Sequence, residues 1–284
     1  MKLALLFTAA LTFPTHAALI GAWNQDESSG NLIDGTGGHA PAVLVAGGSV
    51  NYSQPGVPAG TYGSLIVTNA AGTSIGYGPN ASDDYFISGA TNSNPVMDIP
   101  RTGAFTVMSW INPNAPDIAR TYRPISTGSG TGTDRGWGLG LRLNDTVGNS
   151  AAVRFTNYGV ADNDSDPFVL TFGQWIHIAV TYNNGSINYF LNGNALTGGD
   201  TSLFGDDLAA ARLTIGGRIG TLAGGTGGND GDQMNGLLDG VQVYNTVLTV
   251  GEIRAAAVGS VIPEPSVTGC GLLLFSLAGM RRRR

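Results

Sequence analysis

The feature that most constrains the fold is a pair of β-type segments separated by Asn183-Asn184-Gly185. Large apolar residues recur at every second position in segment 175–182 and again in segment 187–191. That period of two is typical of a strand with two distinct faces. The Asn-Gly pair favours the tight turn that joins antiparallel strands, because both residues tolerate positive φ. The stretch therefore predicts a β-hairpin.

Other segments carry the same signature. Segment 105–111 is rich in β-branched and aromatic residues and ends before Pro113. Segment 138–143 places a leucine at every second position, so that Leu139, Leu141 and Leu143 share one face. Segments 105–111 and 175–182 are apolar on both faces, which is typical of central strands in a layered fold. Two further strands are predicted at 213–215 and 237–244.

One short helix is predicted near the end of this region. Thr249 and Glu252 have the spacing of a capping box, and an apolar stretch continues to Val258. Many short strands, turns rich in asparagine and glycine and almost no helix indicate an all-β protein. We therefore expect an antiparallel β-sandwich with one short C-terminal helix.

The N-terminal residues 1–17 have the order of a secretory signal peptide. Lys2 precedes an apolar run of 11 residues from Leu3 to Phe13, and the small residue Ala17 ends the segment. The run is too short to span a bilayer, which takes about 20 residues. We expect cleavage after Ala17, with Ala18 as the alternative position.

The C-terminal residues 261–284 form a segment of three parts. Pro263-Glu264-Pro265 is followed by an apolar stretch of 15 residues from Ser266 to Met280 and by Arg281–Arg284. As a helix the stretch would cover roughly 22 Å of a hydrocarbon core of about 30 Å. The terminal arginines would remain cytoplasmic. A short helix behind four charges is typical of a transient membrane anchor, and the alternative is an ordinary tail anchor.

This three-part segment resembles the PEP-CTERM sorting signal. The resemblance implies cleavage near Pro263, Glu264 and Pro265 by an exosortase-type membrane protease. It also implies an exported protein at the cell surface or in the extracellular matrix of a Gram-negative-type bacterium that makes extracellular polysaccharide. The membrane would then be a partner only transiently, through the tail.

The charge of the mature chain limits its partners. Without Lys2 and the four terminal arginines, nine of the 14 basic residues remain against 20 acidic ones, a net charge of about −11. A nucleic-acid-binding surface is basic, and so is one that binds anionic lipid, so we expect neither partner. The sole cysteine, Cys270, lies in the tail, so no disulfide is expected in the mature domain.

Residues 18–260 resemble a laminin-G-like domain, a jelly roll of the concanavalin A type. The sequences FTVMSWINP, WIHIAVTYNNGSINYFLNG, LTIGG and MNGLLDGVQVYNTVLTVGEI carry the resemblance, with Trp23 and residues 26–31 as its opening. It covers about residues 19–257 and is strongest from Phe105 onward. Residues 40–93 match poorly and are interpreted as additional strands and loops. A departure from the family pattern is Gly240, where an acidic residue often follows the aspartate.

Catalytic signatures are sparse. Glycoside hydrolases occur on this fold and use a pair of carboxylates, but the mature glutamates are only Glu27, Glu252 and Glu264. The sequence contains no H-E-x-x-H motif. His177 is interpreted as a packed, hydrogen-bonded core histidine. The acidic residues 162–166 resemble an EF-hand only in spacing, because Pro167 replaces the turn glycine, and they are interpreted as a solvated loop.

The laminin-G resemblance also implies a structural calcium ion at Asp26, Asp34 and Asp239, because hard oxygen ligands suit that ion. The alternative for Asp26 and Asp34 is a turn-capping role. Trp137 and Tyr158 are predicted as exposed aromatics on a ligand-binding face.

We therefore expect a non-catalytic domain that recognises carbohydrate or protein, with extracellular polysaccharide or a surface protein as its partner. The competing interpretations are a structural matrix protein without a discrete ligand and a polysaccharide-active glycoside hydrolase.

Overall fold

A computed structural model describes residues 18–44, 49–69, 72–78, 86–88, 103–116, 120–128, 136–143, 149–203, 212–218 and 232–259. The predicted processing positions Ala17, Pro263, Glu264 and Pro265 lie outside these ranges. Within them, no helix is both long and apolar enough to cross a membrane.

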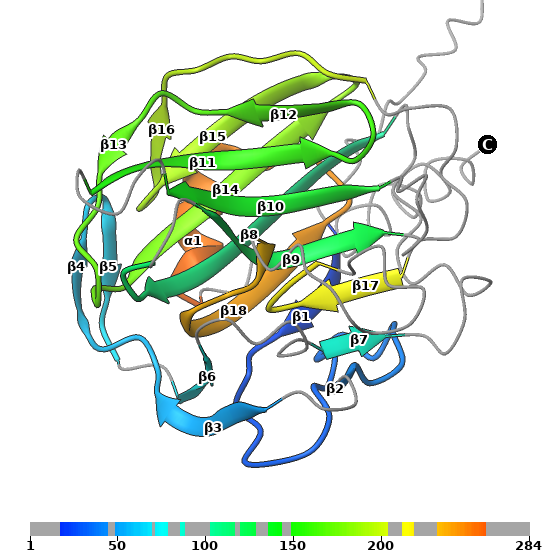
Figure 1. Cartoon of the computed structure of the whole chain (residues 1–284). Helices are drawn as coiled ribbons and strands as arrows, with labels where there is room; N and C mark the ends of the chain where they lie inside the picture. Colours follow the sequence, from blue (N-terminus) through cyan, green and yellow to red (C-terminus); the bar gives the residue numbers. More distant parts are fainter. Residues whose placement is uncertain are drawn as a thin grey trace, which may run out of the picture.

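The described chain forms two stacked antiparallel sheets, a small hairpin and one helix, which confirms the predicted sandwich (Figure 1). We call the two large sheets the first and the second sheet. The first sheet has the order β16-β15-β14-β8-β18-β6-β3, with β1 also paired to β18. Its strands are β1 (Leu19–Trp23), β3 (Val50–Pro55), β6 (Thr73–Tyr77), β8 (Ala104–Pro113), β14 (Ile176–Asn183), β15 (Ser186–Leu191), β16 (Asn194–Leu196) and β18 (Gly236–Tyr244).

The second sheet has the order β12-β11-β10-β9-β17-β7-β2, with β13 also paired to β11. Figure 1 shows β9 to β12 in front of β8, β14 and β15. The remaining elements are the hairpin of β4 (Gly60–Tyr62) and β5 (Leu65–Val67) and the helix α1 (Val250–Ala257). The strands of the second sheet are β2 (Val43–Leu44), β7 (Phe86–Ser88), β9 (Arg120–Gly128), β10 (Trp137–Leu143), β11 (Ser150–Asn157), β12 (Ala161–Asp164), β13 (Phe168–Val169) and β17 (Arg212–Ile215).

The predicted hairpin is the pair β14–β15. Its last facing pair is Asn183 and Ser186. Between them Asn184 has φ 48° and Gly185 has φ 98°, and two successive positive φ angles define the tight turn that the Asn-Gly pair favours. Both the hairpin and its turn are therefore confirmed.

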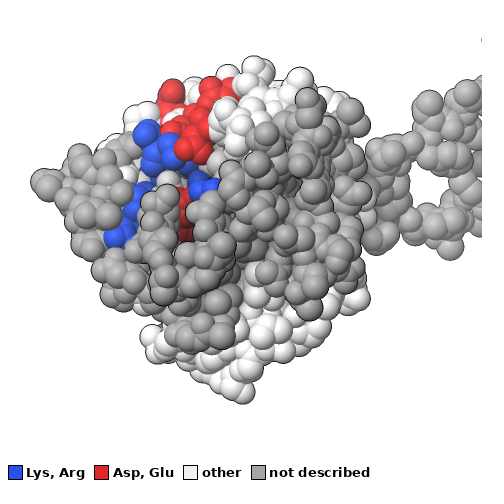
Figure 2. Space-filling view, turned by 45° about the vertical axis from the view of Figure 1, so that its right-hand side comes forward, with Lys and Arg blue, Asp and Glu red and all other residues white. Residues whose placement is uncertain are grey.

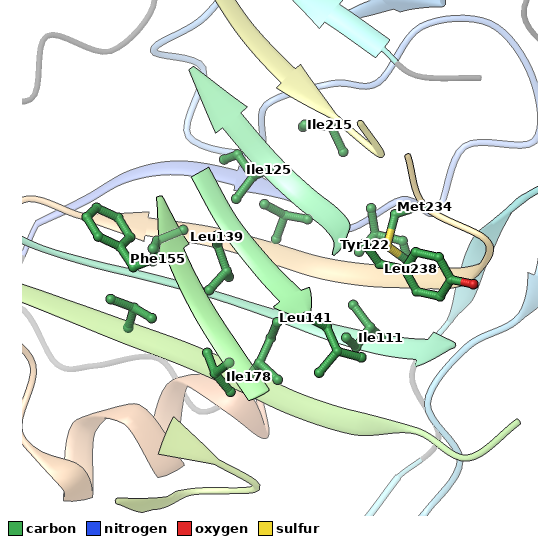
Figure 3. Packing of buried hydrophobic residues seen from close by; sticks show 14 of the residues in the cluster. Ile111, Tyr122, Ile125, Leu139, Leu141, Phe155, Ile178, Ile215, Met234 and Leu238 are labelled. Carbon is green, nitrogen blue, oxygen red and sulfur yellow. The ribbon is translucent and has the colours of Figure 1, made fainter. Parts of the chain in front are cut away.

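The main core lies between the two sheets, where the inward faces of their strands meet (Figure 3). Leu139 and Leu141 of β10 and Phe155 of β11 point toward Ile111 of β8 and Ile178 of β14. All five side chains are buried. The predicted alternation of leucines along β10 is thus confirmed.

Apolar packing covers β8 and β14 on the outer face of the first sheet, which explains why these two strands are apolar on both sides. Met108 and Ala179 on this face belong to one buried cluster with Ile253 of α1. Trp110 and Trp175 belong to another, with side chains of and beside the β4–β5 hairpin. The two strands are central, as predicted, and their second apolar face contacts a helix and a hairpin.

The helix begins with the predicted capping box. The Thr249 hydroxyl accepts the N–H of Glu252 at 3.3 Å, and the Glu252 carboxylate accepts the N–H of Thr249 at 2.7 Å. At the other end, the indole N–H of Trp110 donates to the Ala257 carbonyl at 2.7 Å. This last bond holds the helix C-terminus against the first sheet.

Candidate functional site

Asp34 is buried and acts as a turn cap. Its Oδ1 accepts the N–H groups of Ala22 and Thr36, and its Oδ2 accepts the Thr36 hydroxyl and the N–H of His39. The His39 ring nitrogen lies 2.8 Å from the same oxygen. Burial raises the pKa of this carboxyl, but the hydrogen bonds from Thr36, Ala22 and His39 outweigh burial and hold the pKa below its usual range. Both oxygens therefore already have protein donors.

Asp26 and Asp239 instead line one pocket of about 320 Å³. The pairing of Trp23 with Val241 in β1 and β18 brings together these two ends of the domain. Asp26 is exposed, and its Oδ1 accepts the N–H of Thr73 at 2.7 Å. Asp239 is only 5 % exposed. The pocket is also lined by Asn24, Val57, Val67, Asn69, Gly72, Trp110, Gly240, Gln242 and residues 256–259.

The electrostatics of Asp239 are unusual for a carboxylate. Burial, followed by the charge of Asp26, raises its pKa from 3.8 to about 7, against the opposing hydrogen bonds from the backbone of Val57 and Gly240. Its Oδ2 is buried and has no hydrogen-bond partner. A buried ionised carboxylate with one oxygen left without a partner is costly.

A cation would compensate that cost. None of the described residues that line the pocket is basic. The C-terminal end of α1, from Ala256 to Val258, also lines it, and a helix C-terminus carries partial negative charge. Carboxylate and carbonyl oxygens are the ligands that calcium prefers. Within the described ranges no three His, Cys, Asp or Glu side chains form a metal cluster, so a cation here would depend on two carboxylates together with neutral oxygens.

The outer face of the second sheet is polar. Arg154 of β11 binds Asp164 of β12 through two hydrogen bonds of 2.7 and 2.9 Å and Asp162 through one of 2.8 Å. Arg142 of β10 lies 3.0 Å from Asp164. We call these four residues the polar strip. Figure 2 shows acidic and basic side chains adjoining on one part of the surface.

The prediction of a solvated loop at residues 162–166 was wrong in part. Residues 161–164 form strand β12, which pairs with β11 from Asn157 to Arg154. The carboxylates are held by arginine rather than by water. Burial lowers the pKa of Arg154, but Asp164 and Asp162 outweigh burial and raise it above its usual range.

Beside the strip, the same face has a buried polar layer. The Arg123 guanidinium donates to the Thr156 hydroxyl at 2.7 Å and to the Gly138 carbonyl at 3.4 Å. A side chain at Gly138 would place a Cβ 2.6 Å from the Tyr158 hydroxyl and 3.3 Å from Arg123. The glycine in β10 thus makes room for Arg123 and Tyr158.

The predicted exposure of two aromatics was wrong. Trp137 is 2 % exposed and packs in the main core against Phe105 and Phe155, with ring centroids 5.3 and 6.2 Å away. Tyr158 is 3 % exposed, and the guanidinium of Arg218 lies 4.3 Å from its ring centre. Burial raises the pKa of its phenol.

Two other interpretations hold. His177 is buried, its ring lies 5.2 Å from that of Trp110, and burial lowers its pKa to about 3, so the predicted packing in the core is confirmed. Its ring Nδ1 has no hydrogen-bond partner, in contrast to the prediction. Glu252 caps the helix, as expected. Glu27 accepts the N–H of Ile33 at 2.8 Å. Neither glutamate lines the Asp26–Asp239 pocket.

Sequence reasoning missed a second pocket, of about 280 Å³, beside the β4–β5 hairpin. It is formed by residues 61–63, 168–171, 174–176 and 191–192. Segments 168–171 and 174–176 are neighbours in sequence, and the predicted hairpin brings 191–192 beside the start of β14. Residues 61–63 come from a distant part of the chain, and no local pattern indicated that they complete the pocket.

Comparison with known proteins gives relatives of the same fold. One curated protein, adhesion G-protein coupled receptor V1 of Danio rerio, is 27 % identical over 173 residues, which is 58 % of this chain. The chain spans only 2 % of the length of that receptor.

Two solved structures are similar at the level of the fold. Domain 4 of AbnA, a GH43 extracellular arabinanase from Geobacillus stearothermophilus, is 16 % identical, with a TM-score of 0.52 over 86 % of this chain and 100 % of that domain. A Trypanosoma rangeli sialidase is 15 % identical, with a TM-score of 0.53 over 83 % of this chain and 32 % of that enzyme.

The family comparison covers more than half of the chain. The model of the Laminin_G_3 family, described as the concanavalin A-like lectin/glucanases superfamily, matches residues 80–254. This range includes β14 and β15, the polar strip and Asp239. Together with the two antiparallel sheets, this match shows that the chain belongs to the concanavalin A-like lectin/glucanase superfamily.

Proposed function

We propose that this protein is an exported, non-catalytic domain that recognises extracellular carbohydrate. The observation that carries the proposal is the polar strip on the second sheet. Its side chains are held in place by hydrogen bonds between strands and are still partly accessible, with side-chain exposures of 38 % for Arg142 and 46 % for Asp162. The outer face of the first sheet, in contrast, is partly covered by α1 and the β4–β5 hairpin, and the Asp26–Asp239 pocket lies beside them.

The chemistry of the strip suits a polyhydroxylated ligand. Two arginines face two aspartates, so the strip presents charged donors and acceptors without net charge. Hydrogen bonds to ionised groups are stronger than neutral ones and have defined directions. Neighbouring sugar hydroxyls can therefore be bound without a requirement for a charged sugar. The structure of AbnA domain 4 is that of a complex with arabinotriose, which supports this ligand class.

Binding to a gel that contains polysaccharide tests this function. Arg154→Gln removes the central side chain of the strip and should weaken retention of the protein. Arg254→Gln is the matched control, because Arg254 lies on α1 and donates to the Gly193 carbonyl, away from the strip. Equal retention of the two variants and the unchanged protein would refute a role for the strip.

Calcium is proposed as a structural ion rather than as part of the ligand site. Asp26 and Asp239 would be its carboxylate ligands, and the unpartnered Oδ2 of Asp239 is the observation that supports it. Asp34 is left out of this site, because its oxygens are already hydrogen-bonded. The ion would join the first loop of the domain to its last strand.

One observation favours a second function, hydrolysis of a polysaccharide. Asp239 has a pKa of about 7 and shares a pocket with Asp26. A carboxylic acid with a raised pKa beside a second, ionised carboxylate is the pattern of an acid–base pair. Structural relatives include an arabinanase domain and a sialidase. Loss of any polysaccharide cleavage in Asp239→Asn would establish this alternative.

Export and sorting complete the proposal. The signal peptide 1–17 directs the chain across the inner membrane, and an exosortase-type protease removes the tail 261–284. The relationship to an adhesion receptor supports a location at the cell surface or in an extracellular matrix. The partner is extracellular polysaccharide or, as the alternative, a surface protein. A structural matrix protein without a ligand would show no retention in the gel.

A further inference from the structure

The pocket beside the β4–β5 hairpin differs in chemistry from both sites described above. It lies between the hairpin tip at residues 61–63, the segment 168–171 that begins in β13, and the ends of β14 and β15. Figure 1 shows β4, β5 and β13 together at one edge of the sandwich. Its volume of about 280 Å³ is near the lower limit for small-molecule pockets, about 300 Å³.

Aromatic rings form part of its wall. Tyr62 and Phe168 are half-buried, and Trp175 is mostly buried. The Tyr62 ring is fixed in place, because its hydroxyl donates to the Pro58 carbonyl at 2.9 Å and its edge packs on Trp110, with ring centres 5.0 Å apart. A ring that is already ordered loses little entropy when a ligand stacks on it.

Amide and hydroxyl groups form the rest of the wall. Asn192 is held by three backbone-linked bonds: its N–H donates to the His177 carbonyl, its Oδ1 accepts the His177 N–H, and its carbonyl accepts the Ser64 N–H. The side-chain amino group is left as a donor. Gln174 and Thr171 are exposed at the same pocket. Amides provide a donor and an acceptor side by side, which suits adjacent hydroxyls.

The pocket contains no charged side chain among the described residues that line it. A carboxylated or sulfated sugar, a nucleotide or a charged peptide would leave its charge without a partner here. A neutral sugar presents C–H groups on its ring face and hydroxyls at its edge. The C–H groups suit the negative face of an aromatic ring, and the hydroxyls suit amides.

We propose that this pocket binds one or two units of a neutral saccharide. The proposal rests on the proposed function of carbohydrate recognition and assigns a second contact point for it. Both contact points adjoin β11, because β12 pairs with its C-terminal half and β13 with Ser150 and Ala151 at its start. One extended chain could therefore reach both.

Calorimetric titration of the full-length protein tests the pocket. The probes are arabinotriose, xylotriose, cellotriose and, as the acidic comparison, trigalacturonic acid. Tyr62→Leu keeps apolar packing on Trp110 but removes the aromatic face. It should weaken binding of a neutral trisaccharide about tenfold, which corresponds to a loss of roughly 1.4 kcal/mol of binding free energy. Gln174→Ala, an exposed change, should weaken it severalfold.

Tyr52→Leu is the matched control, because Tyr52 is also half-buried and also donates its hydroxyl to a backbone carbonyl, that of Gly30. It should leave the affinity unchanged. Neutral binding that survives both Tyr62→Leu and Gln174→Ala would overturn the pocket and leave carbohydrate recognition standing. Binding of trigalacturonic acid but of no neutral trisaccharide would also overturn the pocket. So would binding of a partner protein that is lost in Tyr62→Leu. If no saccharide binds at all, both proposals fall.

Discussion

Replacement of Asp239 by asparagine should make the protein more stable in the absence of divalent cations and insensitive to calcium. The raised pKa of about 7 means that folded Asp239 keeps its proton up to that pH, whereas the unfolded chain releases it near 3.8. Stability without a cation therefore falls as the pH rises from about 4 to about 7. A difference of about three pKa units corresponds to an upper limit of roughly 4 kcal/mol.

Calcium should recover part of this loss. Extracellular calcium modules bind with dissociation constants of about 10⁻⁴ to 10⁻³ M. At about 1 mM calcium the linkage relation gives roughly 0.4 to 1.4 kcal/mol. For a domain of this size that is a rise in Tm of about 1 to 5 °C. At pH 5 the proton on Asp239 competes, so the affinity falls about a hundredfold and the rise should vanish.

The assay is thermal unfolding at pH 8 and pH 5, with chelator or with calcium, at constant ionic strength. Asp239→Asn should melt above the unchanged protein in chelator at pH 8 and should show no calcium shift. The control is Asp34→Asn, which breaks the hydrogen bonds of a turn cap and should melt lower in every condition while keeping the calcium shift. A calcium shift retained by Asp239→Asn, or lost in Asp34→Asn, would refute the reasoning.

Three further outcomes are expected. Trp137→Ala should destabilise the domain by about 3 to 5 kcal/mol, as measured by denaturant unfolding, and a loss below 1 kcal/mol would contradict its place in the core. Intact mass of the protein from its native host should show no tail, and a mature species that retains Arg281–Arg284 would contradict the sorting signal. Reducing-sugar assays on β-glucans, xylans and galactans should show no release; release that Asp239→Asn abolishes would instead assign an enzyme.

Local patterns predicted much of the fold. The Asn184-Gly185 turn and the capping box of Thr249 and Glu252 each depend on residues within a few positions of one another, so the sequence contains all of their determinants. The six strands β2 to β7 between residues 43 and 88 could be expected only as unspecified strands and loops. Their places in the two large sheets depend on the pairing of β7 with β17 and of β6 with β18, which are distant in sequence, whereas β4 and β5 pair with each other as a local hairpin.

The candidate site was partly predictable. Asp26 and Asp239 share a pocket because β1 pairs with β18. The family resemblance implied that the two aspartates lie close together, and no local signal did. Asp34 precedes Thr36 by two residues, so its capping role had a local cause that competed with the metal interpretation.

The predictions that Trp137 and Tyr158 are exposed were wrong for different reasons. Trp137 is two residues before Leu139, so the alternation along β10 places it on the same inner face as the leucines. Its burial therefore had a local signal in the sequence. Tyr158 is buried beside Arg123 and Arg218, in contacts between separate segments that no pattern around it could reveal.

The most direct test of the central claim is an array of neutral and acidic glycans probed with the purified protein. Carbohydrate recognition predicts selective binding to a subset that includes neutral polysaccharides, competed by the corresponding soluble oligosaccharide. Uniform absence of binding across the array, with the protein shown to be folded by its cooperative melting, would contradict it.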